Sequence, residues 1–347
     1  YIFIFIRNIY ILVFSDISMF FSLFKSNSKK RYPKNLGNKK IVCIGGGTGQ
    51  FSILSGLKEY AESRQNITAI VTTMDSGGSS GVLRTQYGIL PPGDIRNCMV
   101  ALSEETQDIA KLFQYRFDES IKNHNFGNLL LTALCEITGS FQEAIKVGSR
   151  ILRIKGRVIP VSLKENTLMA KLQDGRVIES ESLIDTTKNK VIDKIYLKKR
   201  GKANTQAIDA IKQADIIVFG PGDLYTSILP NLLFKDIRLA IKHNSSAKKV
   251  LISSVMSKPG ETDNFCVSDF KNELEKYLES RLTHVIANSH IPTSTALVNY
   301  RQEDKHPIPL DANNLKNIKI LRGNFIDEDL LVRHSPKKLA KAILKLL

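Results

Sequence analysis

The residues best suited to chemistry stand in a glycine-rich stretch, Ile41 to Leu57, which reads "IVCIGGGTGQFSILSGL". The turn within it consists of Gly45, Gly46, Gly47, Thr48 and Gly49. Because glycine has no Cβ atom, the main chain can turn tightly there and approach a ligand closely. The apolar segment that follows predicts a helix from about Gln50, and a helix amino end offers free N–H groups to a phosphate. The stretch therefore predicts a phosphate-binding turn, although a glycine turn without an anion has the same pattern.

Two common phosphate-binding motifs do not match this turn. A P-loop requires a Lys before its Ser or Thr, and no Lys follows Gly49. The dinucleotide motif G-x-G-x-x-G, counted from Gly45, would place its last glycine at Gln50. The chemistry of the turn must therefore be inferred from its neighbours in the fold.

A second glycine-rich turn follows the next apolar run, in "VTTMDSGGSSGVLR". Asp75 stands at the expected end of a strand, where a carboxylate can meet a ribose hydroxyl or a metal ion, or simply shape the turn. The next residues form a candidate nest of amides and hydroxyls for an anion, namely Gly77, Gly78, Ser79 and Ser80. Arg84 carries a planar fork suited to phosphate, although a solvated helix residue is the alternative. Both turns thus favour the same class of ligand.

Two further segments place polar side chains at the start of apolar helices. In "GILPPGDIRNCMVAL", Asp94 stands where an N-cap belongs, and Arg96 and Asn97 fall in the first helical turn. In "NFGNLLLTAL", Asn128 opens the helix. Helix capping accounts for Asp94 and Asn128 as well as ligand binding does, so both interpretations stay open.

The second half of the chain contains one more turn of this kind, in "DIIVFGPGDLYTSILPNLL". Gly220 and Gly222 lie at its rim, after a continuous apolar run. Tyr225 follows and can either stack on a base or pack in the interior.

The elements that must position these turns alternate along the chain. Short β-branched runs such as "KKIVCIG", "ITAIVTT", "DIIVFG", "KKVLISSV" and "THVIAN" are each followed by a turn and a helix-compatible segment. This alternation predicts an α/β fold with a mostly parallel sheet and helices on both faces. Residues 156–200 instead predict a small antiparallel insert with a turn at Asp174 and Gly175. We expect the glycine-rich turns and "PPGD" to converge at one edge of the sheet.

Composition narrows the function classes. The chain has 347 residues, of which 42% are hydrophobic and 24% charged, as is typical of globular proteins. Its net charge of +16 comes partly from residues 25–40, which carry seven Lys or Arg and no acid. The remaining excess is dispersed and not interleaved with aromatic residues, so nucleic acid is not an expected partner. Four separated cysteines without metal-ligand spacing predict free thiols.

The first 24 residues are nearly all apolar and just long enough to cross a bilayer. Arg7 and Asp16 interrupt the run, and Met19 offers a later start. We therefore expect residues 1–38 to be a tail outside the fold, and residues 39–347 to form one domain that contains the glycine-rich turns. A membrane anchor is the first alternative for the apolar run. A signal peptide is the second, although no A-x-A-like cleavage site follows.

Five motifs in a fixed order resemble one known family. They are "GGGTG", "DSGGSSGVLR", "PPGDIRN", "FGNLLLTAL" and "GPGDLYTSILPNLL". With the C-terminal "VRHSPKKLAKAIL", they resemble the gluconeogenesis factor (YvcK-like) family, which is related to the 2-phospho-L-lactate transferases (CofD). The resemblance covers residues 39–347, including the insert.

This resemblance implies a Rossmann-like sheet, a cytoplasmic protein and a nucleotide-containing ligand. Members of the family are associated with UDP-sugars, notably UDP-N-acetylglucosamine, and with cell-shape control during growth on gluconeogenic carbon. A UDP-sugar is thus the expected ligand, and an NAD(P)-like dinucleotide is the alternative. Arg333 and His334 match an Arg-His pair that is implicated in the ligand site of the family.

The sequence departs from the family in the second turn. YvcK-like sequences usually read D-D-G-G-S-S-G-R-L-R, whereas here Ser76 replaces the second Asp and Val82 replaces the first Arg. These changes argue against a magnesium site built from two Asp of this loop. Asp75 and Asp94 are the carboxylates that remain for a metal ion, and a phosphate at this turn depends on Arg84 and the backbone amides.

Two function hypotheses follow. In the first, the protein is a regulator that senses a UDP-sugar and influences envelope synthesis or carbon flux through a partner protein, alone or as a homo-oligomer. In the second, it is a CofD-like transferase that moves a phospholactyl-type group from a nucleotide carrier to an acceptor alcohol. That reaction needs clamped phosphates, Mg²⁺ and a general base, for which Asp75 and Asp94 are the candidates. The six histidines show neither a metal-type cluster nor a Ser-His-Asp order, which favours the regulator.

Overall fold

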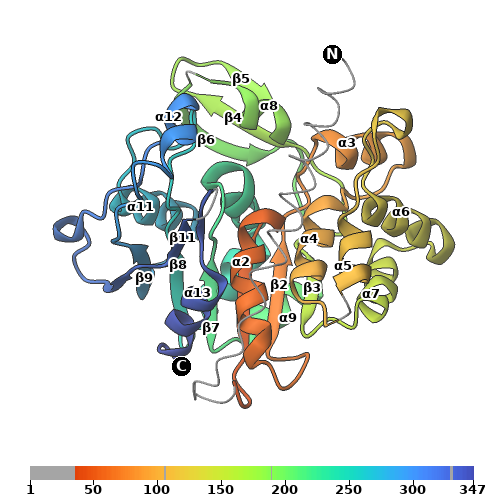
Figure 1. The fold of residues 1–347 in the computed structure, drawn as a ribbon, viewed down its shortest axis with the longest axis horizontal. Coiled ribbons are helices and arrows are strands. Elements are labelled where there is room, and N and C mark those ends of the chain that lie inside the picture. Colours follow the sequence, from red (N-terminus) through yellow and green to blue (C-terminus); the bar gives the residue numbers. More distant parts are fainter. Residues whose placement is uncertain (1–35, 105–106, 189, 329–330) are drawn as a thin grey trace.

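The computed structural model describes residues 36–104, 107–188, 190–328 and 331–347 (Figure 1). The apolar run, with its alternative interpretations, therefore lies outside the described residues. Leu36 belongs to the fold, because its side chain is 2% exposed and its N–H donates to Tyr60 O at 3.0 Å. The folded region thus begins before the boundary predicted between residues 38 and 39. No helix in the described ranges has the length and apolar character needed to cross a membrane.

Seven parallel strands form the central sheet in the order β10-β9-β8-β7-β1-β2-β3. The strands are β1 (Ile41–Gly45), β2 (Ile67–Val71), β3 (Arg157–Pro160), β7 (Ile216–Phe219), β8 (Lys248–Ile252), β9 (His284–Asn288) and β10 (Lys319–Gly323). The chain runs outward from β1 to β3 and then returns to β7, on the other side of β1. In sheets of this kind, ligands bind beyond the carboxyl ends of the strands where the order reverses, here between β1 and β7.

Helices cover both faces of the sheet, which explains why its strands are apolar throughout. In β1, Val42 and Ile44 enter one hydrophobic cluster, while Ile41 and Cys43 enter the other. The first face is covered by α9 (Thr205–Lys212), α10 (Lys235–His243) and α11 (Val267–Leu278). The second is covered by α2 (Gly47–Leu57), α4 (Gly93–Ala101), α5 (Gln107–Gln114), α6 (Phe126–Thr138), α7 (Phe141–Ile151) and α13 (Pro336–Leu344). The predicted α/β fold is confirmed.

The antiparallel insert is smaller than predicted. It contains β4 (Leu168–Leu172), β5 (Val177–Glu179), α8 (Glu181–Thr186) and β6 (Ile192–Leu197), in the sheet order β5-β4-β6 (Figure 1). The expected span of 156–200 starts too early, because residues 157–160 form β3 and pair with β2 at the edge of the main sheet. Leu168, Ala170 and Ile184 are buried in the first-face core, so the insert is packed on the domain.

The C-terminal segment returns to the second face. β11 (Ile326–Glu328) pairs with β12 (Val332–His334), and α13 then packs on α2. A Cβ atom on Gly56 would lie 2.1 Å from Pro336 O, so the two helices are in close contact. The four cysteines are free, as predicted.

Candidate functional site

The turn after β1 and the turn after β7 meet where the strand order reverses. A Cβ atom on Gly49 would lie 2.1 Å from Pro221 O and 2.7 Å from Gly222 Cα, so only glycine permits this approach. Gly220 and Gly222 have φ values of +79° and +145°, which other residues rarely adopt. The turn then enters η3 (Leu224–Ile228), a π-helical segment of a type that is frequent at functional sites.

The turn after β2 and the start of α4 lie at the same edge of the sheet as the turns after β1 and β7. Gly93 N–H donates to Ser80 Oγ at 3.1 Å, and a Cβ atom on Gly93 would lie 3.0 Å from Asp75 Oδ2. Asp94 comes next, and a Cβ atom on Gly47 would lie 2.5 Å from Asp94 Cα. The four loops therefore lie together at one edge of the sheet, as predicted.

Helix α2 begins at Gly47 with Gly46 as its N-cap, earlier than the predicted start near Gln50. The remaining residues of the turn therefore form the first helical turn. Thr48 is exposed there, whereas Gln50 is fully buried against Gly45. The Thr48 hydroxyl is thus the side-chain group that this turn presents to a ligand.

The side chain of Asp94 reaches the amino end of α2. Asp94 is not the N-cap of α4, because that helix begins one residue earlier, at Gly93. Its carboxylate accepts a hydrogen bond from Gly47 N–H, and a Cβ atom on Gly46 would lie 3.1 Å from its Oδ2. Burial and the neighbouring Asp75 raise the pKa of Asp94 to about 7. A carboxyl group that titrates near neutrality thus lies where the glycine pattern predicted a phosphate.

Helix α8 of the insert docks on the turn after β2. Ser76 N–H donates to Glu181 Oε2 at 3.3 Å, and Ser182 N–H donates to Ser76 Oγ at 2.9 Å. Asp75 Oδ1 accepts a hydrogen bond from Gly77 N–H at 3.0 Å. Burial and Asp75 raise the pKa of Glu181 to about 8. The amide of Gly77, which was expected to hold an anion, therefore binds the carboxylate of Asp75, and Ser76, which departs from the family pattern, binds the insert.

Arg84 is engaged by the protein. It lies in α3 (Gly78–Tyr87), its Nε donates to Glu165 Oε1 at 2.9 Å, and its Nη2 donates to Asn166 O at 2.6 Å. Both partners precede β4, so the guanidinium ties α3 to the start of the insert. Its planar fork is used for this connection in the structure.

Arg96 has different surroundings. Its side chain lies in α4 and is 8% exposed, with Nη1 donating to Asn128 Oδ1 at 3.2 Å and Nη2 to Asn97 Oδ1 at 2.7 Å. Its Nε is buried and has no hydrogen-bond partner among the described residues, where no carboxylate lies within ion-pair distance. Burial lowers the pKa of Arg96 to about 10. Buried arginines are normally paired with an anion, so Arg96 is the strongest candidate for an anion contact.

Ser79 and His124 form a contact that sequence reasoning missed. Ser79 Oγ lies 3.0 Å from His124 Nδ1 and accepts hydrogen bonds from Asn125 N–H at 3.3 Å and Asn128 Nδ2 at 3.2 Å. Because both acceptor positions of the hydroxyl are used, its proton must point to Nδ1. Asn125, rather than Asn128, caps α6, and Asn128 instead connects Ser79 to Arg96.

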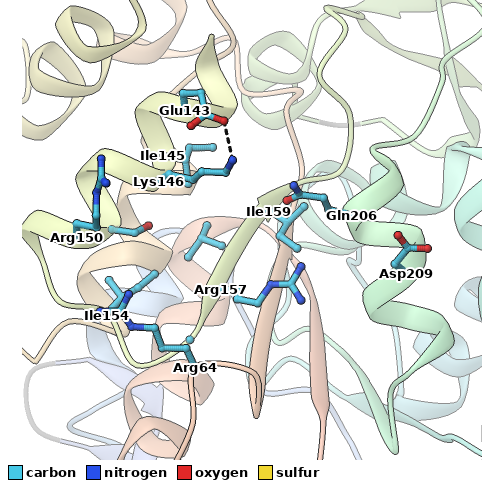
Figure 2. A pocket seen from close by; sticks show the side chains of 13 residues that line it. Arg64, Glu143, Ile145, Lys146, Arg150, Ile154, Arg157, Ile159, Gln206 and Asp209 are labelled. Carbon is cyan, nitrogen blue, oxygen red and sulfur yellow. Dashed lines mark hydrogen bonds and ion pairs between the residues drawn. The ribbon is translucent and has the colours of Figure 1, made fainter. Parts of the chain in front are cut away.

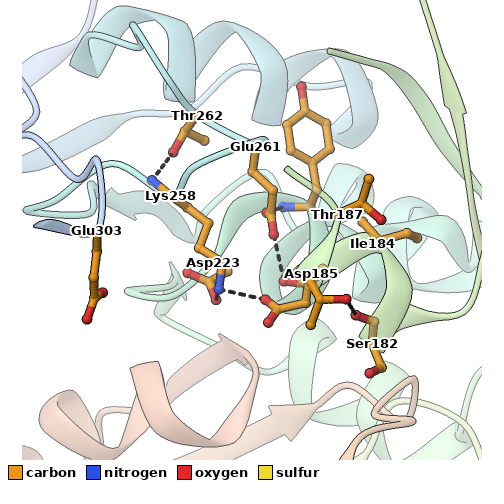
Figure 3. Close-up of polar contacts among 12 residues, drawn as sticks. Ser182, Ile184, Asp185, Thr187, Asp223, Lys258, Glu261, Thr262 and Glu303 are labelled. Carbon is orange, nitrogen blue, oxygen red and sulfur yellow. Dashed lines mark hydrogen bonds and ion pairs between the residues drawn. The ribbon is translucent and has the colours of Figure 1, made fainter. Parts of the chain in front are cut away.

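A charged cluster connects the insert to the turn after β7 (Figure 3). Lys258 Nζ lies 2.7 Å from Asp185 Oδ1 and 3.5 Å from Asp223 Oδ2. Glu261 is 5% exposed and accepts a hydrogen bond from Tyr225 N–H at 3.2 Å. Burial and Asp223 raise the pKa of Glu261 to about 8. Sequence reasoning missed this cluster, for which Asp223 in "GPGD" was the one available signal.

Three of the residues that were predicted to bind a ligand lie away from the point where the four loops meet. The ring of Tyr225 is 3% exposed within the first-face core, so it packs in the interior, the second of its two alternatives. His334 hydrogen-bonds to the main chain of Ser253, which directly follows β8, and burial lowers the pKa of His334 to about 4. The Arg-His pair thus borders the same edge of the sheet, with Arg333 exposed.

Asp75 and Asp94 do not form a metal centre by themselves. Across the residues that the structure describes, no three His, Cys, Asp or Glu side chains are arranged to hold a metal ion. The carboxylates of Asp75 and Asp94 accept hydrogen bonds from the backbone N–H groups of Gly77 and Gly47.

Relatives with known family membership match this chain along most of its length. The family model for 2-phospho-L-lactate transferase CofD matches residues 41–326. An Aquifex aeolicus protein named "Putative gluconeogenesis factor" is 45% identical over 316 residues, which cover 88% of this chain and 96% of that protein. The gluconeogenesis factor of Halalkalibacterium halodurans is 39% identical over 313 residues, with 88% and 96% covered.

A solved structure agrees with the fold. The crystal structure of a upf0052 family protein from Bacillus halodurans is similar with a TM-score of 0.84 at 38% identity, covering 88% of this chain and 98% of that one. Because the family model spans most of the chain and the relatives match along nearly their whole length, the chain belongs to the gluconeogenesis factor family, within the CofD group of proteins.

Proposed function

We propose that this protein is a regulator of gluconeogenic metabolism that binds a nucleotide sugar of the UDP-N-acetylglucosamine type where the four loops converge. Its family supports the metabolic setting. The ligand class is supported by the surroundings of Arg96. Its guanidinium is buried, its Nε has no hydrogen-bond partner, and no carboxylate pairs with it among the described residues. An anion would stabilise this group, and a nucleotide sugar supplies one as its diphosphate.

Asp94 couples this binding to protons. Its carboxylate holds the Gly47 N–H at the amino end of α2, so a phosphate that takes this position must displace it or share a proton with it. The pKa of Asp94 is already raised to about 7 by burial and Asp75, and a nearby phosphate raises it further through like-charge repulsion. Binding therefore takes up a proton, and the affinity for the nucleotide sugar increases as the pH falls from 8 to 6.

The regulatory consequence lies in envelope synthesis and cell shape during growth on gluconeogenic carbon. The ligand reports the supply of an activated sugar, and a partner protein receives the signal in the cytoplasm. Thr48, exposed in the first turn, and Arg333, exposed at the C-terminal border of the site, are the groups that a bound ligand would meet from outside.

Calorimetric titration of the full chain with UDP-N-acetylglucosamine tests the proposal, with GDP and NAD as competing ligand classes. We expect Arg96→Gln to weaken binding roughly ten- to a hundredfold, because a charge-assisted hydrogen bond contributes about 1.5–3 kcal/mol. Arg96→Lys keeps the charge, loses the fork and should give an intermediate loss. Arg84→Gln is the matched control, since its fork is bound to Glu165 and Asn166. Unchanged affinity in a folded Arg96→Gln protein would contradict the proposal.

A second candidate function, group transfer, is favoured by the titration of Asp94 near neutrality. A general base is most effective when its pKa lies near the working pH, and Asp94 meets this condition. In this function Asp94 would accept the proton of an acceptor alcohol as its oxygen attacks the phosphorus of a nucleotide-carried phospholactyl-type group, with the nucleotide as the leaving group. Phosphorus NMR of such a mixture distinguishes the two functions: product that forms with the native protein and not with Asp94→Asn supports transfer, and no product favours the regulator.

A further inference from the structure

A groove of about 540 Å³ lies beside the edge strand β3, away from the candidate site (Figure 2). It is bounded by α7 on one side and α9 on the other, and none of the convergent loops contributes to its lining. Its apolar floor consists of Ile145, Ile154, Val158 and Ile159, which are all buried. A pocket of this volume is in the range that holds small ligands.

The charged lining of the groove comprises four basic residues and two acidic ones, Glu143 and Asp209. Arg64, Arg150 and Arg157 come from three separate segments: the loop before β2, helix α7 and strand β3. Among the described residues, none of the three forms an ion pair or a side-chain hydrogen bond, whereas Lys146 is paired with Glu143 at 2.6 Å. Three arginines without an ion-pair partner among the described residues thus line one groove, and the planar fork of each matches a carboxylate or a phosphate.

The edge of the sheet does not favour an added peptide strand in this groove. Val161 N–H donates to Val71 O, so alternate residues from Arg157 face β2, while Val158 and Pro160 face the free edge. Pro160 has no N–H, so β3 offers a partner strand only the N–H of Val158. Side-chain recognition of a small molecule is therefore favoured over continuation of the sheet.

We infer that this groove is a second binding site, for a small multivalent anion with a short carbon body, such as a polycarboxylate or a sugar phosphate. The arginines bind the anionic groups and the isoleucine floor covers the carbon body. Asp209 lies at the α9 rim, and its negative charge disfavours anionic groups of the ligand on that side of the groove. The site is independent of the nucleotide-sugar proposal, because it shares no lining residue with the convergent loops.

Titration calorimetry of the full chain at a fixed salt concentration of about 0.15 M, with citrate and glucose 1,6-bisphosphate as probes, tests this inference. We expect Arg150→Gln and Arg157→Gln each to weaken binding of the better probe about threefold to tenfold, and the double variant to abolish measurable binding. Arg157→Lys should recover part of the loss. Arg281→Gln is the matched control, an exposed arginine next to β9, across the sheet from the groove.

Labelling of arginines with phenylglyoxal, mapped by peptide mass spectrometry, locates the bound probe. Protection of Arg64, Arg150 and Arg157 but not of Arg281 supports the site, and unchanged affinity for UDP-N-acetylglucosamine in the double variant shows that it is separate. Equal effects of the control and the groove variants, or no protection at the groove, would overturn the inference. Binding of a polyglutamate peptide but of neither probe would also overturn it, in favour of an extended acidic partner.

Discussion

The turns after β1 and β2 are both rich in glycine, but the glycines have different physical roles. In the first turn, Cβ atoms on Gly47 and Gly49 would lie 2.5 Å from Asp94 Cα and 2.1 Å from Pro221 O. In the second, a Cβ atom on Gly77 would meet nothing closer than 3.7 Å, and one on Gly78 would meet nothing within 4 Å. The glycines of the first turn are therefore required by close packing, whereas Gly77 and Gly78 of the second turn have space for a side chain.

This difference shows that a glycine-rich turn is not evidence of an open cradle. At the first turn, the space released by the missing Cβ atoms is filled by α4 and by the turn after β7. At the second, Gly78 has a φ value of +44° and is exposed, so glycine serves the turn itself. Four substitutions test whether the two turns differ in this way.

Gly49→Ala should have the largest effect. Its Cβ atom would overlap a backbone carbonyl, which cannot rotate away, so the turn after β7 must move. We expect the free energy of unfolding to fall by roughly 3 kcal/mol. Urea denaturation followed by circular dichroism measures this loss. A native-like stability would show that the two turns are less tightly packed than the structure indicates.

Asp94→Asn should change the pH dependence of stability. The pKa of Asp94 is raised by burial and Asp75 from 3.8 to about 7 in the folded state, so this state holds an extra proton between these values. The native protein therefore loses stability as the pH rises from about 4 to 7, and the loss persists above pH 7. Relative to the native protein, the Asn variant should gain on the order of 2 kcal/mol between pH 5 and pH 8. If the difference in unfolding free energy between the two proteins were the same at pH 5 and pH 8, this prediction would be contradicted.

Ser79→Ala should destabilise the second turn. The change leaves His124 Nδ1, the Asn125 N–H and one amide hydrogen of Asn128 without their buried partner. We expect a loss of about 1–2 kcal/mol by thermal unfolding. Thr85→Ala, on the exposed part of the same helix, is the control. Equal losses in both variants would mean that the Ser79 network contributes no more than an exposed helix position.

Gly77→Ala should have the smallest effect on the fold. Its backbone has a φ value of −95°, which alanine adopts freely, and its Cβ atom would make only an ordinary contact at 3.7 Å. We expect the free energy of unfolding to stay within about 0.5 kcal/mol of the native value. A loss as large as that of Gly49→Ala would remove the distinction between the two turns.

Much of the fold was predictable from the sequence. The apolar β-branched runs between Lys39 and Asn288, each followed by a turn and a helix, indicated a parallel sheet covered on both faces. The insert was predicted by its D-G turn, but its start was misplaced, because "GRVIP" has the same local pattern in an edge strand as in a hairpin. Pairing partners depend on the tertiary fold, which strand propensity does not encode.

The candidate site was predictable in position but not in its contacts. Arg84 and Arg96 looked alike in sequence, yet one is bound to Glu165 and the other is buried without a carboxylate partner in the described structure. Nothing local distinguishes them, because the difference arises from segments that lie far away in the chain. The same is true of His124, which meets Ser79 only because α6 packs near the start of α3.

The strand pattern was sufficient to predict where the glycine-rich turns meet. Parallel strands carry their carboxyl ends to one edge, so the turns at Gly45, Asp75 and Gly220 had to meet there. The groups at that edge follow from the tertiary fold, which brings Asp94 to the amino end of α2 and Glu181 to the second turn, and buries Arg96 in α4. The physical reason is that turns and strand periodicity depend on neighbouring residues, whereas burial, ion pairing and pKa depend on distances between elements that only packing sets.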